Sequence, residues 1–362
     1  MALSARASVD ELARERSVIV CAGPGGVGKT TISAAIALQA ARDGRRACVI
    51  TVDPARRLAD ALGVGALTNS PAAVDGDFAG SLHAMMLDTK GTFDDLVAHY
   101  ARTEAQAEAI RTNRIYQNLT GMLSGTQEYM AMEKLYELTE SGDFDIVVVD
   151  TPPTRNALDL LDAPRRLTRF LDNRLFRALL APTRASLRLL TIATQALLRT
   201  ISKVAGAEIV QDAVDFFQAF EGMEEGFSAR AAAVRDLLAD PATAYVLVTS
   251  PRPDSIEETT YFASRLGDSG IEPAALVVNR VHPSFGPVTT EVGDQSGDLG
   301  ALLENHARLH LAAFDEGEAV AALVERVAPS PVARLPLLGS DVHDLEGLGE
   351  VADHLFGRAG VG

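Results

Sequence analysis

Short apolar runs recur along this chain, most of them separated by helical patterns, and they predict the strands of one sheet. The runs fall at residues 17–22, 46–52, 81–87, 144–150, 243–250, 274–280 and 332–337. Each run is continuously apolar rather than alternating, which indicates that both of its faces are covered. The pattern predicts an α/β fold with a doubly wound, mostly parallel sheet. Functional residues are expected at the carboxyl ends of the strands, where such sheets bind their ligands.

The strand pattern stops between residues 161 and 240, where the chain reads as helical. We predict one domain from residues 1–160 and 241–362, with 161–240 as an inserted helical subdomain. Within it, residues 165–203 carry eight arginines and one lysine against a single acid, among many apolar positions. This basic segment either packs on its own helical neighbours or presents a groove to an amphipathic helix, a lipid or a membrane protein.

Composition narrows the class of protein. A chain of 362 residues with 47% hydrophobic residues is long enough for a sizeable core, and its net charge of −16 disfavours general binding to nucleic acid. Cys21 and Cys48 lie in predicted strands and are expected to be buried, not paired. With no apolar leader after Met1 and no membrane-length apolar run, we expect a cytoplasmic protein, with peripheral membrane contact as the alternative.

A glycine-rich segment follows the first predicted strand and precedes a helical pattern. Residues 23–31 match the phosphate-loop spacing, in which backbone N–H groups and a helix N-terminus bind a nucleotide phosphate. Lys29 is the expected contact to the β- and γ-phosphates and a catalytic residue, and Thr30 the expected Mg²⁺ ligand. A merely flexible turn is the alternative, which the flanking strand and helix disfavour. The predicted nucleotide contacts are Gly23, Gly25, Gly26, Val27, Gly28, Lys29, Thr30 and Thr31.

Three further strand ends carry polar side chains. Asp53 follows the second run and is either a functional carboxylate or a helix N-cap. Asp150 follows four apolar residues, the pattern of the carboxylate that orders Mg²⁺ in phosphate-loop enzymes. After the sixth run, Asn279 and Arg280 stand where a GTP-specific protein would show Asn-Lys-x-Asp, so adenine is favoured over guanine.

Two other features are weaker. His306 and His310 lie four apart on a predicted helix, but the carboxylate of a His-Glu-x-x-His metal site is absent, so we do not expect a metal there. Residues 286–300 are rich in Gly and Thr and are expected to form a mobile loop.

With these residues in place, the chain resembles the ArsA family of arsenite-pump ATPases and ATPases that target tail-anchored membrane proteins. We identify it as a bacterial member that lacks the signature lysine of the family's deviant phosphate loop. The resemblance covers nearly the whole chain. Its motifs, in order, are residues 23–31 (loop), 51–55 with 58–62 (first switch), 82–88 (strand), 150–154 with Leu158, Leu160, Leu161 and Pro164 (second switch), 277–279 and 336–338.

The resemblance implies an ATPase that closes as a dimer around two nucleotides, with a helical subdomain that handles cargo. By position in the family's motifs, Asp53 would orient the attacking water and Asp150 would serve Mg²⁺. Asn279 would contact adenine, and Pro336 would lie beside the base. These roles suit phosphoryl transfer, in which positioning and charge neutralisation do nearly all of the catalysis.

The chain departs from the family pattern at three places. Pro24 stands where the family's loop carries a lysine that reaches the partner's phosphates, and proline brings neither a charge nor an N–H. The zinc-binding Cys-x-x-Cys pair of the dimer seam is missing, as are the cysteines that bind arsenite. We therefore expect neither zinc nor arsenite.

The leading hypothesis is an Mg²⁺-dependent ATP hydrolase that couples dimer opening and closing to a partner at the helical subdomain. Pro24 suggests a heterodimer with a lysine-bearing paralogue, with a homodimer as the alternative and low turnover expected for the chain alone. A rival is a non-catalytic ATP-binding regulatory subunit or chaperone-like module, which the retained Asp53 disfavours. A membrane-surface positioning ATPase is a third possibility, weakened by a C-terminal end with one fixed positive charge, Arg358.

Overall fold

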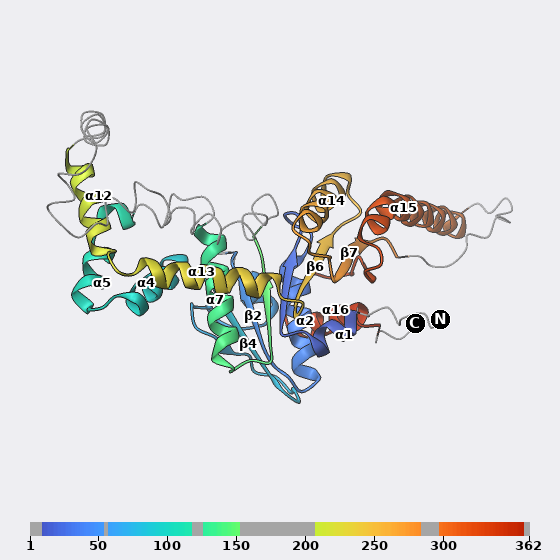
Figure 1. Cartoon of the computed structure of the whole chain (residues 1–362). Coiled ribbons are helices and arrows are strands. Elements are labelled where there is room, and N and C mark those ends of the chain that lie inside the picture. The colour runs from blue at the N-terminus through green and yellow to red at the C-terminus, as the bar shows by residue number, and fades with distance from the viewer. Residues whose placement is uncertain (1–8, 54–56, 118–125, 153–206, 284–296, 358–362) are drawn as a thin grey trace, which may run out of the picture. The chain divides into compact units, whose positions relative to one another are not determined.

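The computed structural model describes residues 9–53, 57–117, 126–152, 207–283 and 297–357 (Figure 1). By its contacts the chain divides into two compact units. The sheet unit comprises the described residues of Met1–Met86, Glu137–Leu158 and Asp240–Gly362. The helical unit comprises those of Leu87–Tyr136 and Asp159–Ala239.

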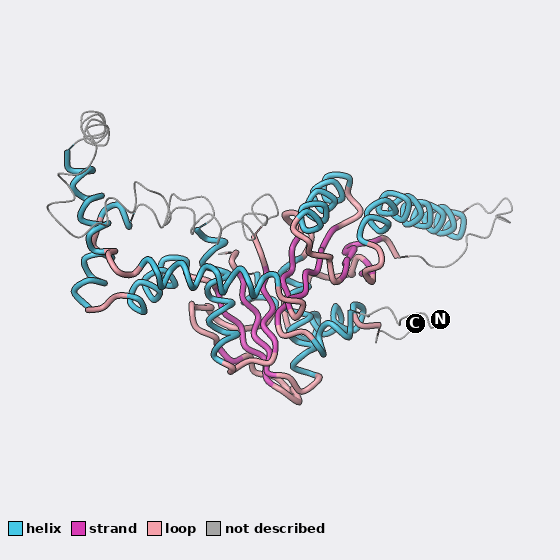
Figure 2. Tube along the Cα trace, in the orientation of Figure 1, coloured by secondary structure: helices cyan, strands magenta, loops and turns pink. Residues whose placement is uncertain are grey.

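The sheet unit contains eight strands in the order β3-β4-β2-β5-β1-β6-β7-β8, with helices against it (Figure 2). Every neighbouring pair is parallel except β3 and β4. The α/β, doubly wound, mostly parallel fold predicted from the apolar runs is confirmed. The strands are β1 (Val18–Ala22), β2 (Arg46–Thr51), β3 (Ala72–Ala73), β4 (Ser81–Met86), β5 (Ile146–Asp150), β6 (Thr243–Thr249), β7 (Ala275–Val281) and β8 (Val332–Pro336).

All seven predicted runs form strands, and each observed strand lies within about two residues of its predicted bounds. The two-residue β3 was not predicted, because two exposed alanines carry no strand signal. The central strand β1 pairs with β5 on one side and β6 on the other, and all five of its residues are buried. Its two faces are thus closed to water, as a continuously apolar run requires.

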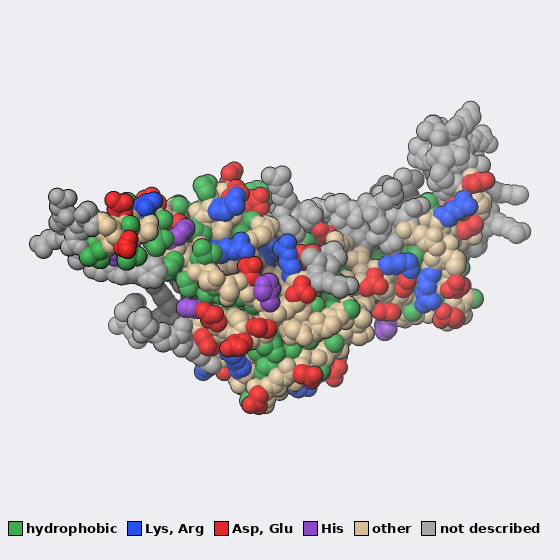
Figure 3. All heavy atoms as spheres, turned by 180° about the vertical axis from the view of Figure 1, so that it is seen from behind, with side chains coloured by type: hydrophobic (Ala, Val, Ile, Leu, Met, Phe, Trp, Pro, Cys, Tyr) green, Lys and Arg blue, Asp and Glu red, His purple; other side chains and the backbone are tan. Residues whose placement is uncertain are grey.

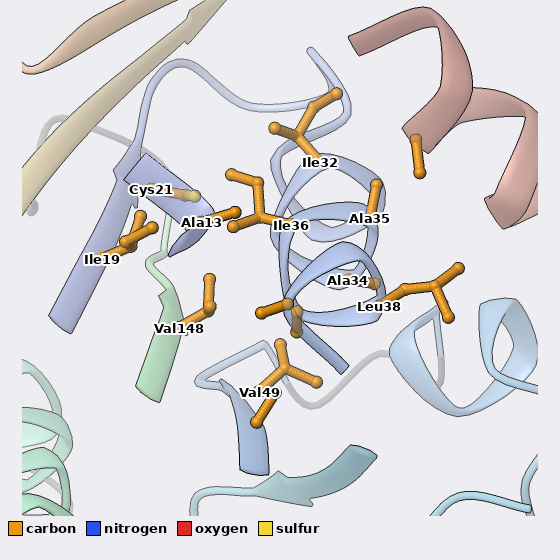
Figure 4. Close-up of a cluster of buried hydrophobic side chains, with 14 of the residues drawn as sticks. Ala13, Ile19, Cys21, Ile32, Ala34, Ala35, Ile36, Leu38, Val49 and Val148 are labelled. Carbon is orange, nitrogen blue, oxygen red and sulfur yellow. The ribbon is translucent and has the colours of Figure 1, made fainter. Parts of the chain in front are cut away.

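Helix α2 (Lys29–Arg42) contributes many residues to an apolar cluster that also includes residues of the neighbouring strands. It packs against β2 and β5 and against helix α16 (Leu345–Leu355). Figure 4 shows Ile36 of α2 directed toward Ile19 and Val148 of the neighbouring strands. A helix that is apolar nearly all round is expected to be buried on every side, and most residues of α2 are.

The remaining helices of the sheet unit complete its layers. Helix α1 packs on α2, α14 packs on β6, and α15 packs on α14 and β7. Cys21 and Cys48 are fully buried, as predicted, and burial raises the pKa of the Cys21 thiol to about 12. The helices are α1 (Val9–Glu15), α3 (Arg57–Ala61), α14 (Pro253–Asp268) and α15 (Asp298–Val327).

Helix α15 is long and only partly covered. Its buried positions, Val320, Leu323 and Val327, all belong to its C-terminal third. The predicted mobile loop at residues 286–300 is corrected at its end, because residues 298–300 are the first turn of α15; most of the rest lies outside the described residues. His306 and His310 lie on this helix, and the described residues hold no cluster of three or more metal-ligating side chains.

The helical unit is built around aromatic side chains. Phe220 and Phe227 have ring centroids 4.9 Å apart, and Tyr100 lies 5.3 Å from Phe227. Arg230 donates to the buried carboxylate of Glu133 at 2.6 Å, so an ion pair lies beside this apolar centre. The described helices are α4 (Thr89–Tyr100), α5 (Glu104–Arg111), α7 (Thr126–Ser141), which continues into the sheet unit, α12 (Ala207–Ala219) and α13 (Glu224–Ala239).

This unit draws on more of the chain than the predicted insert. Helix α5 packs on α12, and Gln106 donates to the carbonyl of Ala219 at 2.8 Å. Residues 87–136, which the sequence pattern assigned to the first domain, thus share a unit with the described part of 161–240. The basic segment 165–203 lies outside the described residues.

Two properties of the described residues concern possible partners: the charge of the surface and the apolar length of the helices. Figure 3 shows acidic side chains over much of the face it presents, with Lys and Arg side chains between them, as expected for a net charge of −16. In the described part of the chain, no helix combines the length and the apolar character needed to cross a bilayer.

The packing around α2 predicts how much stability is lost when a buried side chain of this helix is shortened to alanine. Ile36→Ala removes a side chain that is 1% exposed, and the resulting cavity is expected to lower the free energy of unfolding by ~2–4 kcal/mol. Leu302→Ala on α15, where the side chain is 64% exposed, is the control and should change it by less than ~0.5 kcal/mol. Urea denaturation followed by circular dichroism measures both. Similar losses in the two variants would contradict this view of the core.

Candidate functional site

Residues 23–31 form a tight turn between β1 and α2. Gly26 and Gly28 adopt left-handed backbone conformations with φ of 76° and 93°, which side chains with a Cβ rarely adopt. Gly23 is needed for a different reason, since a Cβ there would lie 2.0 Å from the carbonyl oxygen of Val248 on β6. The turn ends at the N-terminus of α2, where free backbone N–H groups favour an anion.

Lys29 is the first residue of α2 and is 7% exposed. Its Nζ donates to the carbonyl oxygen of Pro24 at 2.8 Å, so the ammonium lies against its own loop. Burial lowers the pKa of Lys29, and the negative charges of Asp150 and Asp53 act in the opposite direction. A buried ammonium bonded to a single loop carbonyl is well placed to exchange that oxygen for one on a phosphate.

Asp150 joins three elements of the site. Its Oδ2 accepts hydrogen bonds from Thr30 Oγ1 at 2.7 Å and from Thr51 Oγ1 at 2.9 Å. In the sheet Asp150 is opposite both Cys21 of β1 and Thr51 of β2, so parallel pairing places the carboxylate next to the phosphate loop. The sequence predicted Thr30 and Asp150 separately as metal-binding residues, and the structure brings them into direct contact.

The second carboxylate oxygen of Asp150, Oδ1, differs from Oδ2 in its hydrogen bonding. Asp150 is 1% exposed, and its Oδ1 is buried without a hydrogen-bond partner among the described residues. Burial raises the pKa of this carboxyl, while the hydrogen bonds from Thr30 and Thr51 act against the rise. An unsatisfied buried carboxylate oxygen beside a threonine hydroxyl fits a hard cation or the water bound to one, so the residues present suit Mg²⁺.

Asp53 lies two residues beyond the end of β2. Its backbone N–H donates to Thr51 Oγ1 at 3.2 Å, and its carboxylate is close enough to favour the charged form of Lys29. Thr51 thus bonds both carboxylate-bearing residues, through the side chain of Asp150 and the backbone of Asp53. Sequence analysis missed Thr51 as a site residue, because its contact with Asp150 depends on the register of β2 with β5.

The end of β7 contacts the outer side of the loop. Asn279 Nδ2 donates to the carbonyl of Val27 at 2.8 Å, and Arg280 donates to the carbonyl of Gly26 at 2.8 Å. Sequence analysis used Arg280 only to argue against guanine and missed its contact. Pro336 ends β8 opposite Val281 in the register, and the structure gives it no hydrogen bond to the loop.

The chain was compared with known proteins. Residues 16–357 match the model of the anion-transporting ATPase family. An uncharacterised protein of Streptomyces coelicolor is 32% identical over 74% of this chain and 63% of its own length. ATPase asna-1 of Caenorhabditis elegans is 31% identical over 44% of this chain and 49% of its own. ATPase GET3 of Malassezia globosa is 27% identical over 73% and 72%.

The alignments do not cover the whole length of these relatives. The chain spans 63%, 49% and 42% of the lengths of the first three curated relatives it matches.

The burial of Asp150 predicts how the free energy of unfolding changes when a substitution removes its charge. Because burial raises the folded-state pKa of Asp150, its ionised form opposes folding above that pKa, and the opposition disappears as pH falls through it. Asp150→Asn keeps an oxygen to accept from Thr30 and Thr51, so near neutral pH its free energy of unfolding should equal that of the wild type or exceed it by up to ~2 kcal/mol. Any gain should shrink as pH is lowered through the raised folded-state pKa of Asp150.

A control at the amino end of β5, the strand that ends in Asp150, should respond with the other sign. Hydrogen bonds from Arg46 lower the pKa of Asp145 to about 2, so its stabilising effect is fully present above the unfolded-state pKa and is lost as pH falls from there through the folded-state pKa of about 2. Asp145→Asn should therefore lower the melting temperature near neutral pH. Thermal unfolding of nucleotide-free protein measures both variants, and a clear loss of stability in Asp150→Asn would contradict the assignment.

Proposed function

The chain belongs to the anion-transporting ATPase family, and from this membership and the geometry at residues 23–31 we propose that it binds and hydrolyses ATP with Mg²⁺. The observation that carries the proposal is the contact between Thr30, Asp150 and Thr51 next to the buried Lys29. A threonine hydroxyl and a carboxylate beside a phosphate loop are the groups that hold Mg²⁺ in phosphate-loop enzymes.

Each part of the loop has a task in this proposal. The N–H groups of residues 25–31 bind phosphate oxygens, and Lys29 moves from the Pro24 carbonyl to the β- and γ-phosphates. Thr30 and the free oxygen of Asp150 hold the cation and its water. Bound Mg²⁺ would neutralise charge on the β- and γ-phosphates during transfer.

Asp53 is proposed to orient the attacking water. It follows the strand that carries Thr51, and its backbone bonds that residue, which in turn bonds Asp150. This places a carboxylate next to the groups proposed to hold the phosphates. For the base, we propose adenine at the carboxyl ends of β7 and β8, with contacts from Asn279 and Pro336.

The partner side of the proposal rests on the helical segment 161–240 and the resemblance to the ArsA family. We propose that nucleotide-driven opening and closing of a dimer is coupled to an amphipathic or membrane-associated partner bound by this segment. The place of action would be the cytoplasm, including its membrane surface.

Pro24 supports a specific form of the dimer. In this chain the loop position that would carry the cross-dimer lysine holds a buried proline, and the carbonyl of that proline is occupied by Lys29. We propose that a lysine-bearing paralogue supplies the missing charge in a heterodimer.

One substitution is expected to abolish nucleotide binding, and another to slow hydrolysis while binding is kept. Lys29→Ala is expected to lose the rise in melting temperature that ATP with Mg²⁺ produces in the wild type, because the phosphate charge is no longer neutralised. Asp53→Asn should keep that rise but hydrolyse ATP ~10²–10³-fold more slowly, with a phosphate-release assay as the measurement. Unchanged turnover in Asp53→Asn would remove Asp53 from the mechanism. A wild type that binds ATP without hydrolysing it, alone or with a paralogue, would favour the non-catalytic ATP-binding subunit.

The dimer proposal predicts a gain of function. Pro24→Lys should raise the ATP turnover of the purified chain at least about tenfold, because each copy then brings a cation to its partner's phosphates. Pro24→Ala is the matched control, since it removes the proline without adding a charge. An equal effect of the two variants, or full activity of the wild type alone that Pro24→Lys leaves unchanged, would argue against the heterodimer.

A further inference from the structure

Arg280 has an unusual backbone for its residue type. Among the described residues it is the one non-glycine with a positive φ, 63°. It lies in a stretch of β7 where the pairing with β8 shifts register between Val278 and Val281. Such irregularities re-aim side chains, and a residue with a Cβ adopts the left-handed conformation at an energetic cost.

In this irregular stretch of β7, the side chains of Asn279 and Arg280 bind two successive carbonyls of the loop at residues 23–31. Asn279 Nδ2 donates to Val27 and the Arg280 guanidinium donates to Gly26, each at 2.8 Å. The backbone N–H of Arg280 donates in turn to Asn279 Oδ1 at 2.9 Å, which holds the amide in place.

The loop is shaped to receive this contact. A Cβ at position 28 would lie 2.3 Å from Asn279 Nδ2, so Gly28 is needed for the amide to approach. Position 28 also has a φ of 93°, which glycine adopts without strain.

The two carbonyls matter because of the N–H groups on the other side of their peptide bonds. The carbonyl of Gly26 shares a peptide with the N–H of Val27, and the carbonyl of Val27 shares one with the N–H of Gly28. A donor on the oxygen polarises the peptide and makes its N–H a stronger donor, and a charged donor does so more than a neutral one. Both N–H groups belong to the segment that binds phosphate in the proposed function.

A purely structural role for position 280 is difficult to reconcile with its conformation. Glycine would adopt a φ of 63° without strain, whereas arginine does so at a cost. The guanidinium also brings a fixed positive charge to a loop in which Pro24 has none and Lys29 is bonded to a carbonyl.

We propose that Arg280 is a positioning residue for phosphate binding, acting with Asn279 as a clamp that holds and polarises the phosphate loop from outside. The clamp deepens the proposed function and rests on it, because its effect requires that the loop bind a nucleotide. It supplies within one chain a positive charge at a loop in which Pro24 brings none.

The test compares three substitutions in the full chain by isothermal titration with Mg·ATP and with Mg·tripolyphosphate, which has no base. Arg280→Gly removes the charge and the backbone strain together, and should weaken both ligands by the same factor, about tenfold or more. Arg280→Lys keeps a charge and should restore most of the affinity. Arg326→Ala on α15 removes one exposed arginine elsewhere in the sheet unit and should leave affinity unchanged.

The melting temperature of Arg280→Gly distinguishes a positioning role of Arg280 from a role in folding. In nucleotide-free protein the melting temperature of Arg280→Gly should stay equal to the wild type or rise, since glycine relieves the strain. Wild-type affinity for both ligands in Arg280→Gly would overturn the clamp, as would a loss confined to ATP, which would assign Arg280 to the base instead. A wild type that binds neither ligand would overturn the proposed function itself.

Discussion

One buried carboxylate organises the sheet unit. Asp150 is almost completely removed from water, and a charge in that position is tolerated only when neighbouring groups donate to it. Thr51 of β2 and Thr30 of α2 do so at one oxygen, and Lys29 lies close enough to act on its charge. The register of β1, β2 and β5 and the start of α2 are therefore tied to a single side chain. The other oxygen has no hydrogen-bond partner among the described residues, and it is the oxygen proposed above to hold the cation.

Much of this arrangement was predictable from local pattern. Continuous apolar runs placed seven strands, because burial on both faces leaves no room for polar alternation. The glycine spacing at residues 23–31 placed the turn, since only glycine fits the conformations at 26 and 28. The rule that parallel strand ends share one edge placed Asp150 on the same side of the sheet as residues 23–31, but the hydrogen bond between Thr30 and Asp150 was not predicted.

What pattern did not reveal depends on three-dimensional contact. Thr51 and Arg280 owe their positions to the register of β2 with β5 and to a local shift between β7 and β8, and neither is encoded in a short stretch of sequence. The membership of residues 87–136 in the helical unit arises in the same way. Their amphipathic helices read like the covering helices of any α/β sheet, and only packing such as that of Gln106 against the end of α12 distinguishes them.

The central strand has a consequence for how the protein is made. Val18 pairs with Val147 on one side and with Thr243 on the other, so β1 leaves the ribosome long before either neighbour exists. During that interval a strand of five core residues, including a cysteine, has no partner, and residues 159–239 must be synthesised between the arrival of β5 and that of β6. Pairings this distant in sequence form slowly and leave apolar edges open to wrong contacts. The chain is accordingly one whose yield in cells should depend on chaperones that protect nascent strands, more than its final stability would suggest.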